Sequence, residues 1–343
     1  MKPARRDWRK APWVAPAEIS ALLAPVSGNT INGVGETKPR RPRQIFWARN
    51  ADDVTHADLL RAVVGRFNGP KVLHEVYAHA DRGPRRPVPV AEARAPADAA
   101  QLTARVKAFV RNLPGGRPDG YPGTGSEAEL VGIAALREEW VYEGKGSGLP
   151  FVVVMGIVMD HARLSQVTPD PEHPVSALEV ADQYNRGARV ANYTAQWIRE
   201  QGYDARPHAG PWVGSLNLIP AALAAGFGEM GKHGSIINRT FGSSFRLAAV
   251  ETDMPLMADR PDSFGADDFC TRCRVCTDAC PPQAISPVKD WVRGEHKWWV
   301  DFDKCIPYFN ETYGCGICIA ACPWSTPGRA PKLAATWAER KEQ

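Results

Sequence analysis

The sequence predicts an α+β protein in which a mixed core of helices and strands precedes a small cysteine-rich domain. The first observation is the length of 343 residues, 44% of them hydrophobic, which is enough for one large or two smaller cores. The second is that segments with helical spacing alternate with short valine-rich segments over residues 52–253. The third is that all eight cysteines lie between Cys270 and Cys322.

The cysteines form two runs with related spacing. The first run is C-x2-C-x2-C-x3-C-P, and the second is C-x9-C-x2-C-x3-C-P. In the bacterial ferredoxin run, which the first run matches, the fourth cysteine ligates the other of two clusters. We therefore predict two 4Fe-4S clusters in a ferredoxin-like domain. Their ligands are Cys270, Cys273, Cys276 and Cys322 for one cluster, and Cys280, Cys305, Cys315 and Cys318 for the other.

Two other uses of the cysteines are weaker. Structural zinc usually takes pairs of cysteines separated by a long loop, whereas the first run places four within eleven residues. Disulfides suit small secreted domains. Two adjacent clusters form a path for single electrons, so the remaining residues are expected to supply a redox centre or a substrate site.

Composition and charge narrow the location and the partners. The net charge of +4 is mild, so nucleic acid is an unlikely partner. No run of 18 apolar residues occurs, and no apolar stretch follows the arginine pair near the start, so neither a membrane helix nor an export signal is expected. We interpret the protein as cytoplasmic, which suits reduced thiols.

Periodicity predicts the elements of the core. Helices are expected at 52–67, 99–113, 127–139, 173–201 and 216–225, and strands at 149–160, 203–208, 235–242 and 244–253. The expected division is an N-terminal region (1–140) that packs on the core, the core (141–260), the cluster domain (261–330) and a peripheral tail (331–343). Asp160 and His161 end the strand at 149–160, either as ligand groups or as a polar strand terminus.

A glycine-rich loop follows the helix at 216–225. Glycines at 226, 228, 231 and 234 indicate a backbone that must approach something closely, and a large flat cofactor would explain the missing side chains. The spacing is not the dinucleotide-binding fingerprint. Tyr184 falls on the inward stripe of the helix at 173–201, and Arg246 lies in the strand at 244–253; a core tyrosine and a surface arginine are the alternatives.

The order of these motifs resembles the reductive dehalogenases. The resemblance covers residues 175–327 and is carried by GYDAR, AGFGEMGKHGSIINRTFGSSFRLAAVETDMPL and DSFGADDFCTRCRVCTDACPPQAIS, followed by the second cysteine run. It implies a nitroreductase-like α/β core that holds a corrinoid (cobalamin) in its base-off form. The implied corrinoid contacts are Gly226, Gly228, Lys232, His233 and Gly234. It also implies that Tyr184 donates a proton and that Arg246 stabilises the resulting phenolate.

The implied activity is reductive removal of halogen from a small organohalide, with an aryl halide expected. An external donor such as a ferredoxin or a flavin reductase would supply the electrons. The family often has an asparagine or lysine just after its GY-x-A segment; here the stretch that follows, RPHAGPWVGS, is longer, and either His208 or Ser215 takes that place or no residue does. Two alternatives stay open: a tRNA-modifying enzyme like the epoxyqueuosine reductases, and a two-cluster electron-transfer protein without its own active site.

Overall fold

A four-stranded antiparallel sheet forms the centre of the computed structural model, which describes residues 10–341 except 24–25, 85, 95, 114–125, 147, 209, 211 and 213. Its strands, in spatial order, are β1 (Leu130–Ala135), β2 (Phe151–Val158), β6 (Phe245–Thr252) and β3 (Ala205–His208). The strands β2 and β6 pair along eight residues each, and their register sets Ile157 opposite Arg246. The predicted strands 149–160, 203–208 and 244–253 are therefore confirmed.

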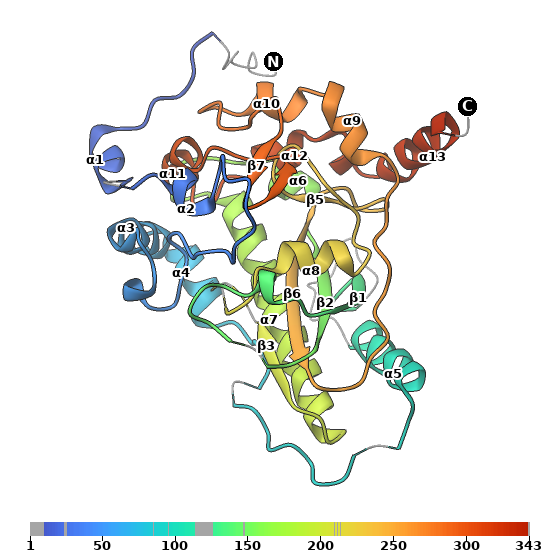
Figure 1. Ribbon diagram of the computed structural model, residues 1–343. Helices are drawn as coiled ribbons and strands as arrows, with labels where there is room; N and C mark the ends of the chain where they lie inside the picture. The colour runs from blue at the N-terminus through green and yellow to red at the C-terminus, as the bar shows by residue number, and fades with distance from the viewer. Residues whose placement is uncertain are drawn as a thin grey trace.

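Helices cover both faces of this sheet (Figure 1). On one face, Val153, Met155 and Ile157 pack against α7 (Val175–Glu200) and α5 (Ala99–Asn112). On the other face, Val152 and Val154 pack against α8 (Leu218–Ala224) and the short helix η3 (Glu138–Trp140). Since side chains alternate between the faces of a strand, a sheet covered on both sides takes an unbroken apolar run.

The same arrangement explains a wrong prediction. Residues 127–139 do not form the predicted α-helix: they contain the strand β1 and then the start of the short 3₁₀ helix η3. Ile133 faces one layer and its neighbour Ala134 the other, and both are buried. Apolar residues on both faces of a strand give spacings of three and four that imitate a helix. The sheet therefore begins ahead of residue 141, where the core was predicted to start.

The cluster domain lies at one end of the core (Figure 1). Its elements are α9 (Ala266–Arg272), α10 (Val275–Ala279), β7 (Asp290–Val292), β8 (Glu295–Lys297), α11 (Phe302–Glu311), α12 (Ile317–Ala321), η4 (Pro323–Ser325) and α13 (Ala330–Lys341). The tail was predicted to be peripheral, but α13 packs on this domain. The indole of Trp337 contacts the ring of Phe269 edge-on, with 5.4 Å between the ring centroids.

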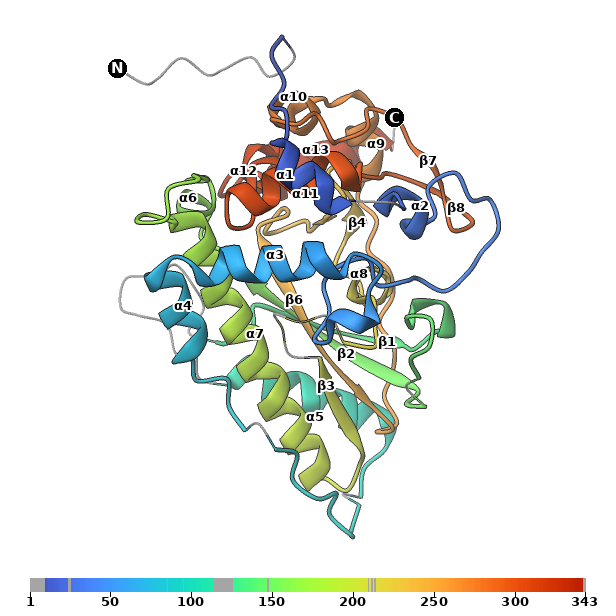
Figure 2. The same ribbon diagram turned by 90° about the vertical axis from the view of Figure 1, so that its left-hand side faces the viewer.

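The N-terminal region wraps the side of the molecule between the core and the cluster domain (Figure 2). Its elements are α1 (Ala17–Ser20), η1 (Ala21–Leu23), α2 (Gly28–Asn32), η2 (Ala51–Asp53), α3 (Ala57–Asn68) and α4 (Lys71–Ala78). The start of α2 docks on α11, because the Gly28 amide donates to Asp303 Oδ1 over 2.9 Å and the Asn29 side chain donates to Asp301 Oδ1 over 2.9 Å. Leu59 and Val63 of α3 pack against Ile306 of α11.

Three short elements complete the fold: α6 (His161–Leu164), β4 (Glu229–Met230) and β5 (Ile236–Ile237). The predicted strand at 235–242 is thus only two residues long. The predicted helices at 52–67, 173–201 and 216–225 correspond to α3, α7 and α8. The segment 114–126, whose many glycines and prolines predict a loop, lies, apart from its last residue, outside the described residues. Among the helices of the described residues, none has the length and apolarity that crossing a membrane requires.

Candidate functional site

The structure gathers the cysteines into the two predicted sets. The pKa of Cys270 and of Cys276 is raised to about 12, chiefly by burial and in part by the neighbouring thiols of Cys322 and Cys273. Burial likewise raises the pKa of Cys322 to about 11. The thiols of the first set, three of them buried and Cys273 half-buried, therefore lie close together. The raised pKa values of Cys270, Cys276 and Cys322 keep these three thiols neutral without iron, so binding a cluster must release their protons.

The second set is equally close. The thiols of Cys315 and Cys280 raise the pKa of Cys305, in addition to burial, and Cys318 responds to Cys315, Cys305 and Cys280. The weakest influence on Cys318 comes from Cys276 of the first set, so the two sets are neighbours. Among the described residues, no three histidine, cysteine or acidic side chains stand close enough to hold a single metal ion; thiolates on the corners of a four-iron cube stand farther apart.

Buried polar atoms beside the thiols fit a cluster. Thr277 Oγ1 and Trp324 Nε1 are buried and have no hydrogen-bond partner among the described residues. Thr277 directly follows Cys276, and Trp324 comes two residues after Cys322. An unpaired buried donor is costly, and the sulfides of a cluster are acceptors that would satisfy both. The residues present therefore fit two 4Fe-4S clusters.

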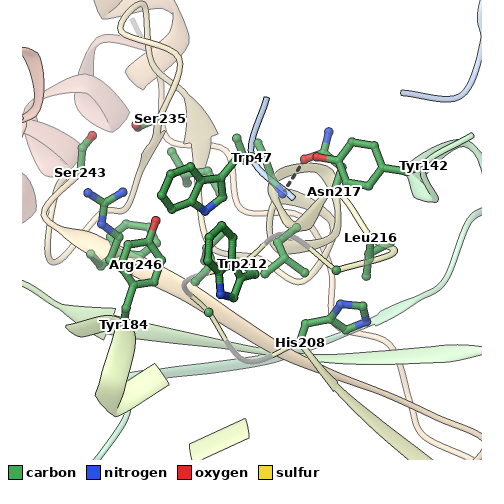
Figure 3. Close-up of a pocket in the computed structure, with 17 residues that line it drawn as sticks. Trp47, Tyr142, Tyr184, His208, Trp212, Leu216, Asn217, Ser235, Ser243 and Arg246 are labelled. Atoms are coloured by element: carbon green, nitrogen blue, oxygen red, sulfur yellow. Dashed lines mark hydrogen bonds between the residues drawn. The ribbon is translucent and has the colours of Figure 1, made fainter. Parts of the chain in front are cut away.

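A cavity of about 300 Å³ lies between the core and the segment that leads to β6. Tyr184 from the middle of α7 and Arg246 from β6 line one end of it, with Ser235 and Ser243 close by (Figure 3). The Arg246 guanidinium carbon lies 5.3 Å from the centre of the Tyr184 ring. Gly210 lines the cavity as well, and a Cβ on it would stand 2.5 Å from Tyr184 Cδ1. The two residues predicted to be catalytic are thus brought together.

A third residue lies near this pair without having been predicted. Tyr77, at the end of α4, is close enough for its phenol to respond to both groups: burial raises its pKa first, Tyr184 raises it further, and Arg246 lowers it. The sequence contained no signal for Tyr77, because the contact joins segments about a hundred residues apart. Tyr77 lines a second cavity of about 810 Å³.

The two cavities meet at a pair of tryptophans. Trp47 and Trp212 line both cavities and stack on each other, with ring centroids 5.1 Å apart and planes 26° apart. Figure 3 shows the pair between the Tyr184 end of the smaller cavity and Tyr142 at its other end. Neither tryptophan was predicted, because Trp47 comes from an N-terminal segment with no regular periodicity. Asn217 faces the same cavity and caps α8, its Oδ1 accepting from the Ile219 amide over 3.3 Å.

His208 and Ser215, the two suggested replacements for the polar family residue, converge on one buried carboxylate. His208 Nε2 lies 2.8 Å from Glu251 Oε1, and the Ser215 hydroxyl donates to the same oxygen over 3.4 Å. Of these two residues, His208 lines the cavity and Ser215 does not. Asp160 and His161 are structural instead: Asp160 Oδ1 accepts from the Arg163 amide over 2.9 Å, and His161 Nε2 lies 2.9 Å from Ala320 O.

The glycine-rich loop has close neighbours within the chain itself. A Cβ on Gly226 would stand 2.7 Å from Arg260 O, and one on Gly228 would stand 2.0 Å from Ile237 O. Both residues, like Gly234, have positive φ angles (82°, 126° and 77°). The missing side chains thus have a reason that needs no cofactor. The predicted corrinoid contacts of this loop stay a prediction.

His233 in this loop fixes the direction of a hydrogen bond at the cavity wall. Its Nδ1 accepts from the Ser235 amide over 3.2 Å, and its Nε2 lies 3.1 Å from Ser243 Oγ. Burial lowers the pKa of His233 to about 4, so the ring is neutral and carries its proton on Nε2. Ser243 Oγ therefore accepts from the ring, and its own proton is available to another acceptor.

The fold and the thiol sets define a two-cluster iron–sulfur protein with an α+β core. A family model described as a 4Fe-4S dicluster domain matches residues 269–326. The chain is 32% identical over 215 residues to the tetrachloroethene reductive dehalogenase of Desulfitobacterium hafniense. The aligned region covers 59% of this chain and 38% of that protein. An epoxyqueuosine reductase of Leadbetterella byssophila is 36% identical over 125 residues, 32% of this chain and 37% of that protein.

The solved structure of the catabolic reductive dehalogenase NpRdhA agrees with the fold. It superposes with a TM-score of 0.69 at 25% identity, over 92% of this chain and 46% of that one. The predicted fold and the predicted relationship to the reductive dehalogenases are confirmed. This chain spans less than half the length of these relatives.

Proposed function

We propose that this protein is a reductive dehalogenase-like oxidoreductase that uses a corrinoid and two 4Fe-4S clusters to replace a halogen with hydrogen. The observation that carries the proposal is the pairing of Tyr184 with Arg246 on the wall of a cavity beside the cluster domain. The overall reaction takes up two electrons and one proton and releases a halide ion. An external donor delivers the electrons one at a time through the clusters.

The protein's own contribution is the proton. When bound, a corrinoid supplies a low-valent metal centre at which the carbon–halogen bond is broken reductively. Tyr184 Oη donates its proton to the carbon that loses the halogen, and the Arg246 guanidinium stabilises the phenolate that remains. Arginine suits this role because it stays charged when buried. Arg246 Nε is buried without a hydrogen-bond partner among the described residues, so the group is free to respond to charge in the cavity.

The volume of the site limits how a corrinoid can be bound. A cavity of about 300 Å³ accommodates a small substrate, whereas a corrinoid is far larger. The adjoining cavity of about 810 Å³ supplies the additional room on the other side of the Trp47–Trp212 pair. A corrinoid therefore fits only if it occupies both cavities and the two indoles separate.

The proposed substrate class is a small aryl halide. Indole rings such as those of Trp47 and Trp212 bind flat aromatic molecules by stacking. Support also comes from NpRdhA, whose structure is known in complex with 3-bromo-4-hydroxybenzoic acid and superposes with a TM-score of 0.67 at 26% identity. A second solved structure, of a reductive dehalogenase for which a mechanism of B12-dependent dehalogenation has been suggested, superposes with a TM-score of 0.68 at 26% identity.

Reduction of epoxyqueuosine in tRNA is the second candidate, favoured by the 36% identity over 125 residues to such a reductase. The cavity counts against it. None of the described residues that line it carries a carboxylate, and the buried carboxylate of Glu251 is occupied by His208 and Ser215. The resemblance to the epoxyqueuosine reductases implies an aspartate in the segment that leads into α8, and the matching segment here, WVGSLNLIP, contains no acidic residue.

An anaerobic cofactor assay tests the proposal. The protein is reconstituted with iron, sulfide and hydroxocobalamin, and iron, cobalt and the EPR spectrum are measured. We expect about eight iron atoms and one cobalt per chain, together with halide release from a bromophenol. Turnover of epoxyqueuosine tRNA and not of the bromophenol would select the second candidate. Eight iron atoms with no bound cobalt would leave an electron carrier and would end the roles of Tyr184 and Arg246.

A further inference from the structure

Lys232 of the glycine-rich loop is buried against the first set of cysteines. Only 1% of the residue is exposed. Its Nζ donates to the carbonyl oxygen of Cys273 over 2.8 Å and lies 4.9 Å from the centre of the Trp298 ring. The Lys232 backbone amide forms a hydrogen bond with the Cys270 thiol. One residue thus makes two contacts with the loop that carries these cysteines.

Among the described residues, the ammonium group of Lys232 is not paired directly with an acidic side chain; Asp267 accepts from Nε1 of the Trp298 indole over 2.6 Å. Lys289, on the same indole ring, does form an ion pair with Asp267, over 2.7 Å. An unpaired buried charge is costly unless something of opposite charge lies close. A 4Fe-4S cluster with four thiolate ligands is negative, and one held by the first set of cysteines would supply the opposite charge. Lys232 also acts electrostatically on the Cys276 thiol of the same set.

The second set of cysteines lacks a comparable buried cation among the described residues. The charge that acts on Cys305 is the carboxylate of Asp301 at the start of α11, which pairs with Lys304 over 3.5 Å. The reduction potential of a 4Fe-4S cluster depends on nearby charge and on hydrogen bonds to its sulfurs. A buried cation favours the reduced, more negative cluster, and a carboxylate disfavours it. The two clusters are therefore expected to differ in potential.

We propose that Lys232 is a positioning charge that raises the reduction potential of the cluster held by Cys270, Cys273, Cys276 and Cys322 above that of its neighbour. An electron that enters through the other cluster then settles on this one. The inference rests on the cluster ligands proposed above and does not depend on the substrate or on the corrinoid.

A redox titration followed by EPR tests the proposal on the intact chain with both clusters. Lys232→Met removes the charge and the hydrogen bond, Lys232→Gln removes the charge and keeps a donor, and Lys232→Arg keeps both. We expect the methionine and glutamine variants to lower the midpoint potential of one cluster and leave that of the other in place, while the arginine variant stays near the parent. Lys289→Met is the matched control. Lys289 lies over the same Trp298 ring, but its charge is already neutralised by Asp267.

Three results would overturn the proposal. They are unchanged potentials in both neutral variants, an equal shift of both clusters, and a shift in Lys289→Met as large as that in Lys232→Met. Iron is counted in each variant, and about eight atoms per chain show that both clusters are present. If the methionine variant loses a cluster, the glutamine variant decides. A parent protein without iron would refute the cluster assignment itself and is recognised before any variant is compared.

Discussion

Replacing Tyr184 with phenylalanine removes one hydroxyl group from the cavity and leaves the ring in place. The ring packs against Gly210, where a Cβ would approach to 2.5 Å, and under Arg246, whose guanidinium carbon lies 5.3 Å from its centre. Both contacts involve ring atoms, so the Tyr184→Phe variant is expected to fold, bind both clusters and bind corrinoid like the parent. Only the proton donor is lost.

The size of the effect follows from that role. A positioned general acid contributes about 10²- to 10⁴-fold to a rate, or about 3–5 kcal/mol of barrier. The assay is halide release in a single turnover of reconstituted protein with a bromophenol, with iron and cobalt measured in the same samples. Tyr142→Phe is the control, because Tyr142 lines the same cavity at its opposite end (Figure 3). Unimpaired turnover in Tyr184→Phe, or an equal loss in Tyr142→Phe, would refute the reasoning.

Three further outcomes are expected. Cys276→Ala loses about half of the iron, because one of two four-iron clusters goes; bound zinc in the parent would contradict the ligand sets. Arg186→Met destabilises the fold by about 3–5 kcal/mol in urea unfolding, since it removes the guanidinium that pairs with Glu127 and Glu129, whose side chains are 1% and 2% exposed, while Glu127 keeps its ion pair to Arg189. Burial holds the pKa of His233 at about 4, against 6.5 normally. The unfolded chain therefore takes up this proton first as the pH falls, and about 3 kcal/mol of stability, complete above pH 6.5, is lost progressively towards pH 4.

Matched variants test the last two outcomes. Arg61→Met removes an exposed arginine, 60% accessible and paired with Asp58, and is expected to cost less than about 1 kcal/mol. A similar loss in both arginine variants would mean that the buried network contributes nothing special. For the pH dependence, urea midpoints at pH 7.5 and pH 5 are compared with those of His233→Gln. Equal losses in the two proteins would show that His233 is not the group that titrates.

The parts of this fold that follow from the sequence are those whose cause is local. The cysteine ligands are set by short spacings, and α7 is set by a stripe that includes Val180, Ala188 and Ala191. Both were predicted. The strand β1 was mistaken for a helix because its burial on two faces depends on α5 and α8, which lie elsewhere in the chain.

The candidate site divides in the same way. Tyr184 and Arg246 were found because each belongs to a regular element with a recognisable motif around it. Trp47, Trp212 and Tyr77 were not found, since only the folded chain brings their segments together. The glycine loop was recognised, but its cause was not: the backbone oxygens that exclude a side chain at Gly226 and Gly228 belong to other segments.

If the protein acts as proposed, the contact between the core and the cluster domain determines how electrons reach the cavity. Gly242 has a φ of +59°, and a Cβ on it would stand 2.2 Å from the carbonyl oxygen of Trp324. The next residue, Ser243, lines the cavity, and its amide donates to Ser325 Oγ over 3.1 Å. The Ser325 hydroxyl in turn hydrogen-bonds to the Cys322 thiol. One cavity wall is therefore joined to a cluster ligand by direct backbone packing and two hydrogen bonds, so the distance that an electron must cross is a property of the packed fold and does not require the domains to move.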